Sequence, residues 1–191
     1  VINVIIFGMP GAGKGTQCSL ISERLGLTHI STGDLVRKEI ADKTVVGIEA
    51  ESIINKGLLL DDTIISKIFL NELKKHENGK GFLFDGYPRT VKQAQMLYDM
   101  LKELNLKPNL FIEIVLPVET AVKRILKRAE IEGRSDDKEE TVVARINEYN
   151  KKTSPVKDYF IQKGIYNSVE GVGTVEEINK MITTLITGSD T

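Results

Sequence analysis

Ten residues near the start of the chain have the composition of a cradle for phosphate groups. They read Gly8-Met9-Pro10-Gly11-Ala12-Gly13-Lys14-Gly15-Thr16-Gln17. Glycines let the backbone curve closely around an anion and turn several N–H groups inward, and a lysine in such a turn can reach the outer phosphates of a nucleotide. The apolar run Ile2–Phe7 precedes the segment and a helical stretch follows it, so the helix N-terminus adds a partial positive charge. The segment therefore predicts a binding site for a nucleoside triphosphate.

In one place the segment departs from the general P-loop pattern G-x-x-x-x-G-K-[ST]. Gly8 to Lys14 fit, but Gly15 follows the lysine and the hydroxyl comes one residue later, at Thr16. A serine or threonine directly after the lysine normally helps to hold Mg²⁺. We therefore expect Mg²⁺ to be held mainly by phosphates and water. The alternative is a glycine-rich turn with a lysine by chance, and the strand before it and the helix after it argue against that.

The composition is that of an ordinary globular protein. The chain has 191 residues, 41% of them hydrophobic and 28% charged, which suits a single compact domain of residues 1–191 with small inserted lobes. The formal net charge of −1 gives no support to a nucleic acid as partner. No apolar run approaches the length of a membrane span, and Val1–Phe7 is too short for a signal peptide. We expect no membrane and no nucleic-acid partner.

Cysteine and histidine give no signal of their own. Cys18 is the only cysteine, which excludes an intrachain disulfide and points to the cytoplasm. Its place just after the glycine-rich turn is typical of a small packing residue. His29 and His76 are far apart and share no metal-ligand spacing.

Apolar runs alternate with amphipathic stretches along the chain. The expected strands are Ile2–Phe7, Thr28–Ile30, Gly81–Phe84, Leu110–Leu116 and Ile165–Val169. The expected helices include Thr63–Lys75, Val91–Leu104, Glu119–Ala129, Glu139–Lys163 and Val175–Ile186. This alternation predicts an α/β fold with a parallel sheet covered by helices on both faces.

Two stretches are not simple crossovers. Ser31–Leu60 is long enough for a separate lobe of two short helices, of which Asp34 can cap the first and Gly57 can end the second. Lys127–Asp137 is charged and contains a glycine, so it is predicted to be a surface loop. That loop is either a solvated connector or a lid that brings arginines to phosphates.

Four further motifs could carry chemistry. They are Ser31-Thr32-Gly33-Asp34-Leu35-Val36-Arg37, Gly57-Leu58-Leu59-Leu60-Asp61-Asp62, Phe82-Leu83-Phe84-Asp85-Gly86-Tyr87-Pro88-Arg89-Thr90 with Gln93, and the set Arg124, Arg128, Arg134 and Arg145. Arginine suits phosphate because its planar fork binds two oxygens and keeps its charge. Phosphoryl transfer requires two polyanions to be held in line while their repulsion is neutralised. Fixed cations, a cradle and a metal ion suffice for that.

With these motifs in this order, the chain resembles the adenylate kinases of the nucleoside-monophosphate kinase family, from Ile2 to about Ile186. The resemblance implies a P-loop three-layer α/β/α fold with a five-stranded parallel sheet. It divides the domain into a core of residues 1–30, 61–126 and 138–191, a helical NMP-binding lobe of residues 31–60 and a short lid of residues 127–137. It implies reversible transfer of the ATP γ-phosphoryl group to AMP, giving two ADP, with Mg²⁺, in a monomeric cytoplasmic enzyme.

The resemblance also assigns roles to residues. ATP is expected to contact Gly11, Ala12, Gly13, Lys14, Gly15, Thr16, Arg124, Arg128 and Gly173. AMP is expected to contact Thr32, Arg37, Leu58, Leu59, Leu60, Gly86, Tyr87, Pro88, Arg89, Gln93, Arg134 and Arg145. The catalytic set would be Lys14, Arg89, Arg128, Arg134 and Arg145. Among the AMP contacts, Arg37 and Arg89 match the arginines on the phosphate.

Three carboxylates and the lid complete the expectations. Asp85 ends an apolar strand, where carboxylates of P-loop proteins commonly meet a water on Mg²⁺. Asp136 and Asp137 either hold the lid, through its arginines or its backbone N–H groups, or cap the next helix. Lys127–Asp137 contains no cysteine or histidine, unlike the longer, zinc-stapled lid of some relatives, so we expect no zinc site and no zinc cofactor.

Three alternatives remain at this stage. A UMP-CMP kinase also carries Gly133-Arg134-Ser135-Asp136-Asp137, although Thr32 and Gln93 look like the AMP form. A GTPase-like switch would need Asn-Lys-x-Asp and Asp-x-x-Gly, which the sequence lacks. A non-catalytic nucleotide-binding sensor is disfavoured by the intact arginine set.

Overall fold

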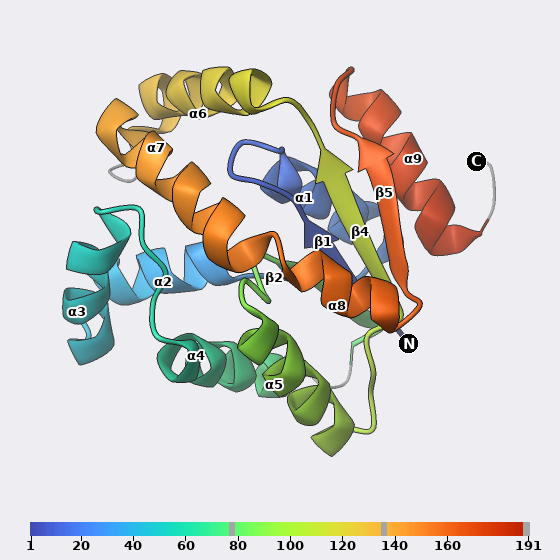
Figure 1. Cartoon of the computed structure of the whole chain (residues 1–191). Coiled ribbons are helices and arrows are strands. Elements are labelled where there is room, and N and C mark those ends of the chain that lie inside the picture. The colour runs from blue at the N-terminus through green and yellow to red at the C-terminus, as the bar shows by residue number, and fades with distance from the viewer. Residues whose placement is uncertain (77–78, 135–136, 189–191) are drawn as a thin grey trace.

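The fold is built on a five-stranded parallel sheet (Figure 1). The computed structural model describes residues 1–76, 79–134 and 137–188. The strands are β1 (Ile2–Phe7), β2 (Thr28–Ser31), β3 (Gly81–Asp85), β4 (Leu110–Val115) and β5 (Tyr166–Glu170), in the spatial order β2-β3-β1-β4-β5. All adjacent pairs are parallel, with Ile5 opposite Phe84 and Phe111, for example. The expected fold class is confirmed.

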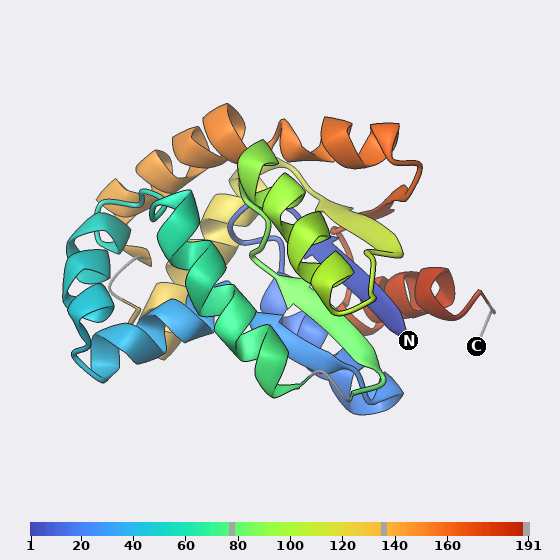
Figure 2. The ribbon, with the colours of Figure 1, turned by 90° about the horizontal axis from the view of Figure 1, so that it is seen from below.

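Alternate residues of the strands belong to two hydrophobic cores, one on each face of the sheet. Val4 and Ile6 of β1 pack with α1 (Lys14–Leu25) and α9 (Val175–Thr187). Ile5 and Phe7 pack on the other face with α4 (Asp62–Lys75), α5 (Val91–Glu103) and α8 (Val156–Gln162). Figure 2 shows α4 and α5 crossing that second face. Strands buried on both faces read as continuous apolar runs, which is why the sequence reveals them.

The remaining helices lie beyond the sheet, on the side where the strands end. Helices α2 (Thr32–Ala41) and α3 (Val45–Ile54) form the two-helix insertion after β2 that the sequence predicts. Helices α6 (Val118–Glu132) and α7 (Glu139–Glu148) follow β4 and share a small core of Ile125, Val142 and Ile146. Figure 1 shows α7 above α2 and α3 at the left of the molecule, and Thr141 of α7 donates a hydrogen bond to the carbonyl of Asn55, just after α3. These four helices therefore surround the carboxyl ends of the strands.

The single helix expected over Glu139–Lys163 is wrong. The structure has α7, then a π-helix, η2 (Tyr149–Thr153), and then α8. Ser154 donates its backbone N–H to the carbonyl of Tyr149, five residues back, instead of four. Pro155 has no N–H and cannot continue a helical ladder. The wider turn changes which face of the segment points to the sheet, which a regular helical period does not predict.

Three smaller expectations also need correction. Ser31, not Asp34, caps α2, because its hydroxyl accepts the N–H of Asp34. Helix α3 ends at Ile54, and Gly57 lies in the turn that follows, at φ +73°. Much of the predicted surface loop 127–137 is helical, since α6 continues to Glu132. Lysine, arginine, alanine and glutamate are good helix formers, so a charged segment need not be a loop.

Candidate active site

The glycine-rich turn lies between β1 and α1, at the carboxyl edge of the sheet where ligands of parallel α/β folds bind. Gly8, Gly11 and Gly13 have φ values of +145°, +83° and +87°, which L-residues rarely adopt. A Cβ on Gly8 would lie 2.7 Å from the Ile114 carbonyl oxygen, and one on Gly11 would lie 2.5 Å from that of Ala121. Gly13 precedes the first residue of α1. Backbone conformation and close packing thus require glycine here.

The side chain of Lys14 folds back over this turn. Its Nζ donates hydrogen bonds to the carbonyl oxygens of Gly8, at 2.8 Å, and Met9, at 3.1 Å. Burial lowers the pKa of Lys14 to about 8, the charge of Asp85 acts in the opposite direction, and the charge of Arg89 lowers the pKa further. A phosphate bound at this point would favour the charged lysine.

A cleft of about 520 Å³ opens beside the turn, and basic side chains line much of it. Of the residues implied for ATP, it contains Gly11, Gly13, Lys14, Gly15, Thr16, Arg124 and Arg128. Ala12 and Gly173 do not line it: Ala12 is 2% exposed and packs in the core. Gly173 precedes α9, and the nearby Gly171 carbonyl accepts a hydrogen bond of 2.9 Å from Arg124. We call this space the phosphate cleft.

Asp137 organises two of the arginines of the cleft. It is fully buried, and the guanidinium of Arg128 donates to both of its oxygens, at 2.6 and 2.7 Å. Arg145 donates to the same carboxylate. Burial would raise the pKa of Asp137, but the hydrogen bonds and charges of the two arginines outweigh burial and hold the pKa below its ordinary value. The carboxylate of Asp137 thus connects α6 and α7 through its hydrogen bonds to Arg128 and Arg145.

This contact decides between the two expectations for Asp137. It holds arginines, and the residue that caps α7 is Lys138. Asp136 and Ser135 lie outside the described residues. Arg134 lines the cleft too and forms an ion pair with Glu132.

A second pocket, of about 120 Å³, adjoins the phosphate cleft between α2, α3 and the loop after β3. It contains all the residues implied for AMP except Arg134: Thr32, Arg37, Leu58, Leu59, Leu60, Gly86, Tyr87, Pro88, Arg89, Gln93 and Arg145. We call it the acceptor pocket. Six residues line both spaces: Pro10, Lys14, Gly33, Arg37, Arg89 and Arg145. Four of these six are cations, so the junction of the two spaces is strongly basic.

Hydrogen bonds fix the polar side chains of the acceptor pocket. Both ends of the Gln93 carboxamide are engaged: Oε1 accepts the N–H of Arg89 at 2.7 Å, and Nε2 donates to Asp62 at 2.9 Å. The Thr32 hydroxyl and Arg89 Nε both donate to the Gly86 carbonyl oxygen, at 2.8 and 2.7 Å. The groups are therefore oriented before any ligand is bound.

Some residues of the acceptor pocket are absent from the sequence-based assignment. Glu148, Tyr149 and Thr153 line it from the end of α7 and from η2. A regular helical period does not predict these residues in the pocket. The π-helix has a wider turn, and it changes the direction in which the following side chains point. Tyr87, by contrast, is assigned to the pocket but buries its ring, which stacks on Phe69 at 4.2 Å.

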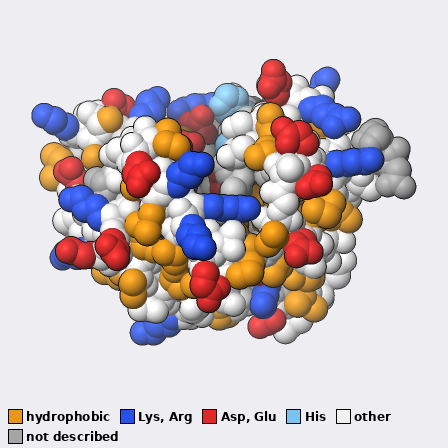
Figure 3. Space-filling view, turned by 90° about the horizontal axis from the view of Figure 1, so that it is seen from above, with side chains coloured by type: hydrophobic (Ala, Val, Ile, Leu, Met, Phe, Trp, Pro, Cys, Tyr) orange, Lys and Arg blue, Asp and Glu red, His pale blue; other side chains and the backbone are white. Residues whose placement is uncertain are grey.

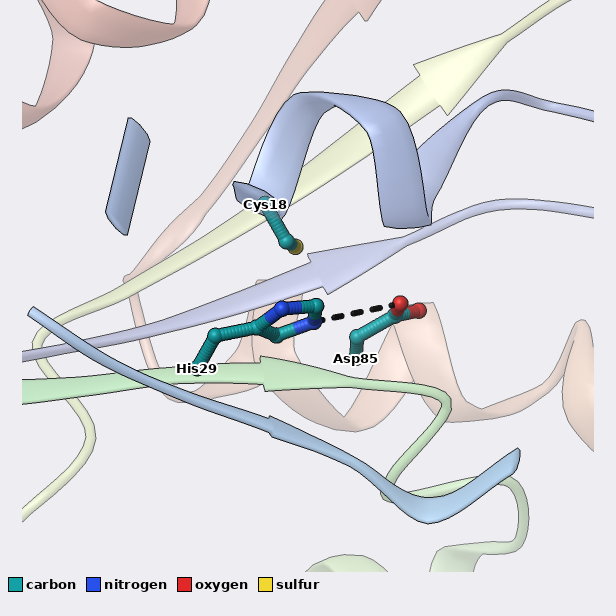
Figure 4. A group of neighbouring side chains, drawn as sticks. All are labelled: Cys18, His29 and Asp85. Carbon is teal, nitrogen blue, oxygen red and sulfur yellow. Dashed lines mark ion pairs between the residues drawn. The ribbon is translucent and has the colours of Figure 1, made fainter. Parts of the chain in front are cut away.

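Asp85 lies at the end of β3 on the floor of the phosphate cleft, as its position after an apolar strand suggests. A Cβ on Gly15 would lie 3.5 Å from Asp85 Oδ2, so the glycine leaves room beside the carboxylate. His29 Nε2 lies 3.4 Å from the same oxygen, and the thiol of Cys18 is directed toward both (Figure 4). The sequence gives no hint of this cluster, since its members come from three separate segments.

The outer surface carries charges of both signs. On the face seen in Figure 3, basic and acidic side chains are interspersed, and a hollow near the upper edge has both kinds beside it. No helix within residues 1–76, 79–134 and 137–188 is both long and apolar enough to cross a membrane. The concentration of cations in the cleft is thus a local feature, as the net charge of −1 requires.

Comparison with known proteins decides the family. The sequence model of the adenylate kinases matches residues 6–165. The chain belongs to the adenylate kinase family. The adenylate kinase of Parabacteroides distasonis is 42% identical over 178 residues, which are 93% of this chain and 94% of that protein. The adenylate kinase of Leptospira biflexa is 42% identical over 179 residues, which are 94% of this chain and 96% of that protein. The adenylate kinase of Flavobacterium johnsoniae is 39% identical over 187 residues, which are 97% of this chain and 98% of that protein.

Membership defines the class of reaction. Adenylate kinases transfer a phosphoryl group between ATP and AMP, so this adenylate kinase family member is a nucleoside-monophosphate kinase, a phosphotransferase. The expected recognition, fold and activity are confirmed. The match covers the glycine-rich turn, the two-helix insertion and the arginines at positions 124, 128, 134 and 145.

Proposed function

We propose that this chain transfers the γ-phosphoryl group of ATP to AMP at the junction of its two cavities. The observation that carries the proposal is the set of four cations, Lys14, Arg37, Arg89 and Arg145, that line both spaces. Two anionic substrates, one in each space, would bring their phosphates together at this point. Fixed cations there offset the repulsion between the substrates and the charge that develops in the transition state.

On the donor side, the backbone N–H groups of residues 11–16 would bind the ATP phosphates, with Lys14 on the phosphoryl group in transfer. Arg124 would lie against adenine, and Arg128 and Arg134 on the phosphates. Lys14 now bonds to carbonyl oxygens of its own turn, so it would exchange these neutral partners for a charged one. Gly173 would offer a backbone contact to the ATP base. It does not line the cleft, so its position gives this role no support.

On the acceptor side, Arg37 and Arg89 would hold the AMP phosphate, and Arg145 would bridge toward the phosphoryl group in transfer. Thr32, Gln93 and the backbone of Leu58–Leu60 would surround adenine. Thr32 and Gln93 look like the AMP form of the family, and hydrogen bonds within the protein hold both side chains in one orientation. Together with the names of the relatives, this supports AMP over the pyrimidine nucleotides of a UMP-CMP kinase.

Mg²⁺ fits the residues at the cleft floor. The carboxylate of Asp85 and the hydroxyl of Thr16 both line the cleft, and Mg²⁺ prefers such oxygen ligands while keeping several waters. Gly15 places no side chain against this carboxylate. We propose that Asp85 holds Mg²⁺ through a water. When bound with ATP, the ion would neutralise phosphate charge.

We propose that the chain divides into a core, an NMP-binding lobe (31–60) and a lid (127–137), and that this division keeps water away from the reacting phosphates. Closing both segments over the substrates would exclude water that could hydrolyse ATP and would bring Arg134 to the phosphates. The enzyme is proposed to act as a cytoplasmic monomer, and this rests on the family resemblance.

The first experiment measures ADP formation from Mg²⁺-ATP with AMP, UMP, CMP, GMP or dAMP as acceptor. We expect a strong preference for AMP. A preference for UMP or CMP would keep the mechanism but overturn the assignment of the adenine pocket. Transfer to none of them would overturn the enzymatic function and favour the sensor.

A second experiment tests the basic junction. Arg89→Ala should lower kcat by roughly 10²–10³-fold, the loss expected for one fixed donor to the transition state, because it removes one of the four cations at the junction. The matched control is Arg24→Ala, an exposed arginine of α1 that lies outside both cavities, which should leave turnover unchanged. Near-normal turnover of Arg89→Ala would remove that residue from the site.

A further inference from the structure

Three side chains that can bind metal ions meet on the floor of the phosphate cleft. Cys18 comes from α1, His29 from β2 and Asp85 from β3, and each offers one ligand atom within 4.8 Å of the other two. Figure 4 shows all three pointing toward a common space between helix and strands. Cys18 and Asp85 are buried, and His29 is partly buried. They come from three separate elements of the core.

The contact between His29 and Asp85 has the spacing of two ligands rather than the geometry of a hydrogen bond. His29 Nε2 is 3.4 Å from Asp85 Oδ2. This nitrogen is buried and has no hydrogen-bond partner among the described residues. Two ligands of a tetrahedral zinc ion, with bonds of about 2.0–2.1 Å, lie roughly 3.3 Å apart. The nitrogen and the oxygen are thus already placed as if to share an ion.

The three donors select a particular kind of metal. A thiolate, an imidazole and a carboxylate suit Zn²⁺ and ions of similar preference, whereas Mg²⁺ prefers oxygen alone. Burial, followed by the charge of Asp85, raises the pKa of the Cys18 thiol well above its ordinary value, so the thiol is neutral without a metal. On binding, the ion displaces this proton to solvent and forms a metal–sulfur bond. The thiolate and the carboxylate then balance its two charges.

The site opens on one side only. His29 and Asp85 line the phosphate cleft, together with Lys14 and Thr16, whereas Cys18 does not. An ion held by the three side chains would therefore have its fourth position directed at the cleft, where water or a phosphate oxygen could complete the tetrahedron. Lys14 and the arginines of the cleft oppose a cation here, and the negative charge of Asp85 offsets part of that opposition.

We propose that Cys18, His29 and Asp85 form a binding site for Zn²⁺ or a similar thiophilic divalent ion, and that its occupation inhibits the enzyme. The inhibition rests on the proposed function, because the ion would take the carboxylate assigned to the Mg²⁺ water. Metal binding itself does not depend on that assignment. The sequence-based expectation of no zinc rests on the lid, which has no cysteine or histidine, and a zinc site in the core departs from that expectation.

The first test is titration of the whole protein with Co²⁺, a spectroscopic substitute for Zn²⁺. Cys18 is the only cysteine, so a thiolate-to-cobalt charge-transfer band can come from no other residue of the chain. We expect this band to saturate at one ion per chain and to be abolished by an equivalent of Zn²⁺. Cys18→Ser and Cys18→Ala should both lack it. Two variants are used so that a folding defect in one does not decide the result.

His29→Asn tests whether the histidine is a ligand. It should weaken Co²⁺ binding by at least about tenfold, the smallest loss usual for metal sites. The matched control is His76→Asn, the other histidine, which is exposed on α4's C-terminal cap and should bind Co²⁺ as the parent does. Absence of the band in the parent protein, or unchanged affinity in His29→Asn, would overturn the site.

The second test measures AMP phosphorylation at fixed Mg²⁺-ATP with increasing Zn²⁺. We expect inhibition that a chelator reverses and that Cys18→Ala escapes by at least about tenfold in Zn²⁺ concentration. Equal inhibition of both proteins would overturn the inhibitory role. A parent protein inactive even without Zn²⁺ would instead contradict the proposed function, while the cobalt titration would still decide the metal site.

Discussion

At the scale of the residue, the most informative group is the Lys14 ammonium. Its pKa is lowered to about 8 by burial, against the charge of Asp85. The charged form is the one that can bind phosphate, so kcat/KM for Mg²⁺-ATP should fall as pH rises through about 8, since this ratio reports the free enzyme. Stability should change in the opposite direction: the free energy of unfolding should rise between pH 8 and 10.5, where the unfolded chain still binds the proton and the folded chain does not.

The pH–rate profile of Lys14→Arg checks this assignment. A guanidinium stays charged over the whole range, so the alkaline fall should vanish from the remaining activity. If the variant keeps the same fall near pH 8, the titrating group is another residue and the lysine is not the source of the pH dependence.

At the scale of the element, Asp137 connects α6 and α7 through Arg128 and Arg145. Asp137→Asn should lower the free energy of unfolding by roughly 1–3 kcal/mol, because the amide cannot satisfy two guanidinium groups at a buried position. The pKa of Asp137 is held below its ordinary value, so its contribution is present above that value and is lost as pH falls through the lowered pKa. Urea denaturation should therefore show a gap between parent and variant at pH 7 that narrows in acid. Asp42→Asn, at an exposed carboxylate, is the control; an equal loss there would contradict the argument.

The elements that the sequence predicts well are those determined by local pattern. The strands, α1, α4, α5 and α9 have apolar periods that match their burial, and the glycine-rich turn has few other uses. The failures have physical causes. The π-helix η2 interrupts the regular period of a long helical stretch. The sequence pattern therefore does not predict that Glu148, Tyr149 and Thr153 line the acceptor pocket. His29 lies close to Cys18 and Asp85 because of how α1, β2 and β3 pack. The spacing of these residues along the chain does not predict that packing.

At the scale of the whole molecule, the two cavities lie between a core and two outer segments, so substrate binding should protect those segments and leave the core unchanged. Hydrogen exchange followed by mass spectrometry can compare the free protein with a complex of a bisubstrate analogue, two adenosines joined by a phosphate chain. We expect slower exchange in residues 31–60 and 127–134, because Arg37, Arg128 and Arg134 would then contact phosphate and the segments would close. Helix α9 packs behind the sheet against α1 and touches neither cavity, so its exchange should stay the same. Equal protection throughout the chain would mean that ligand binding stabilises the fold globally, and the division into core, lobe and lid would then have no basis in the motion of the protein.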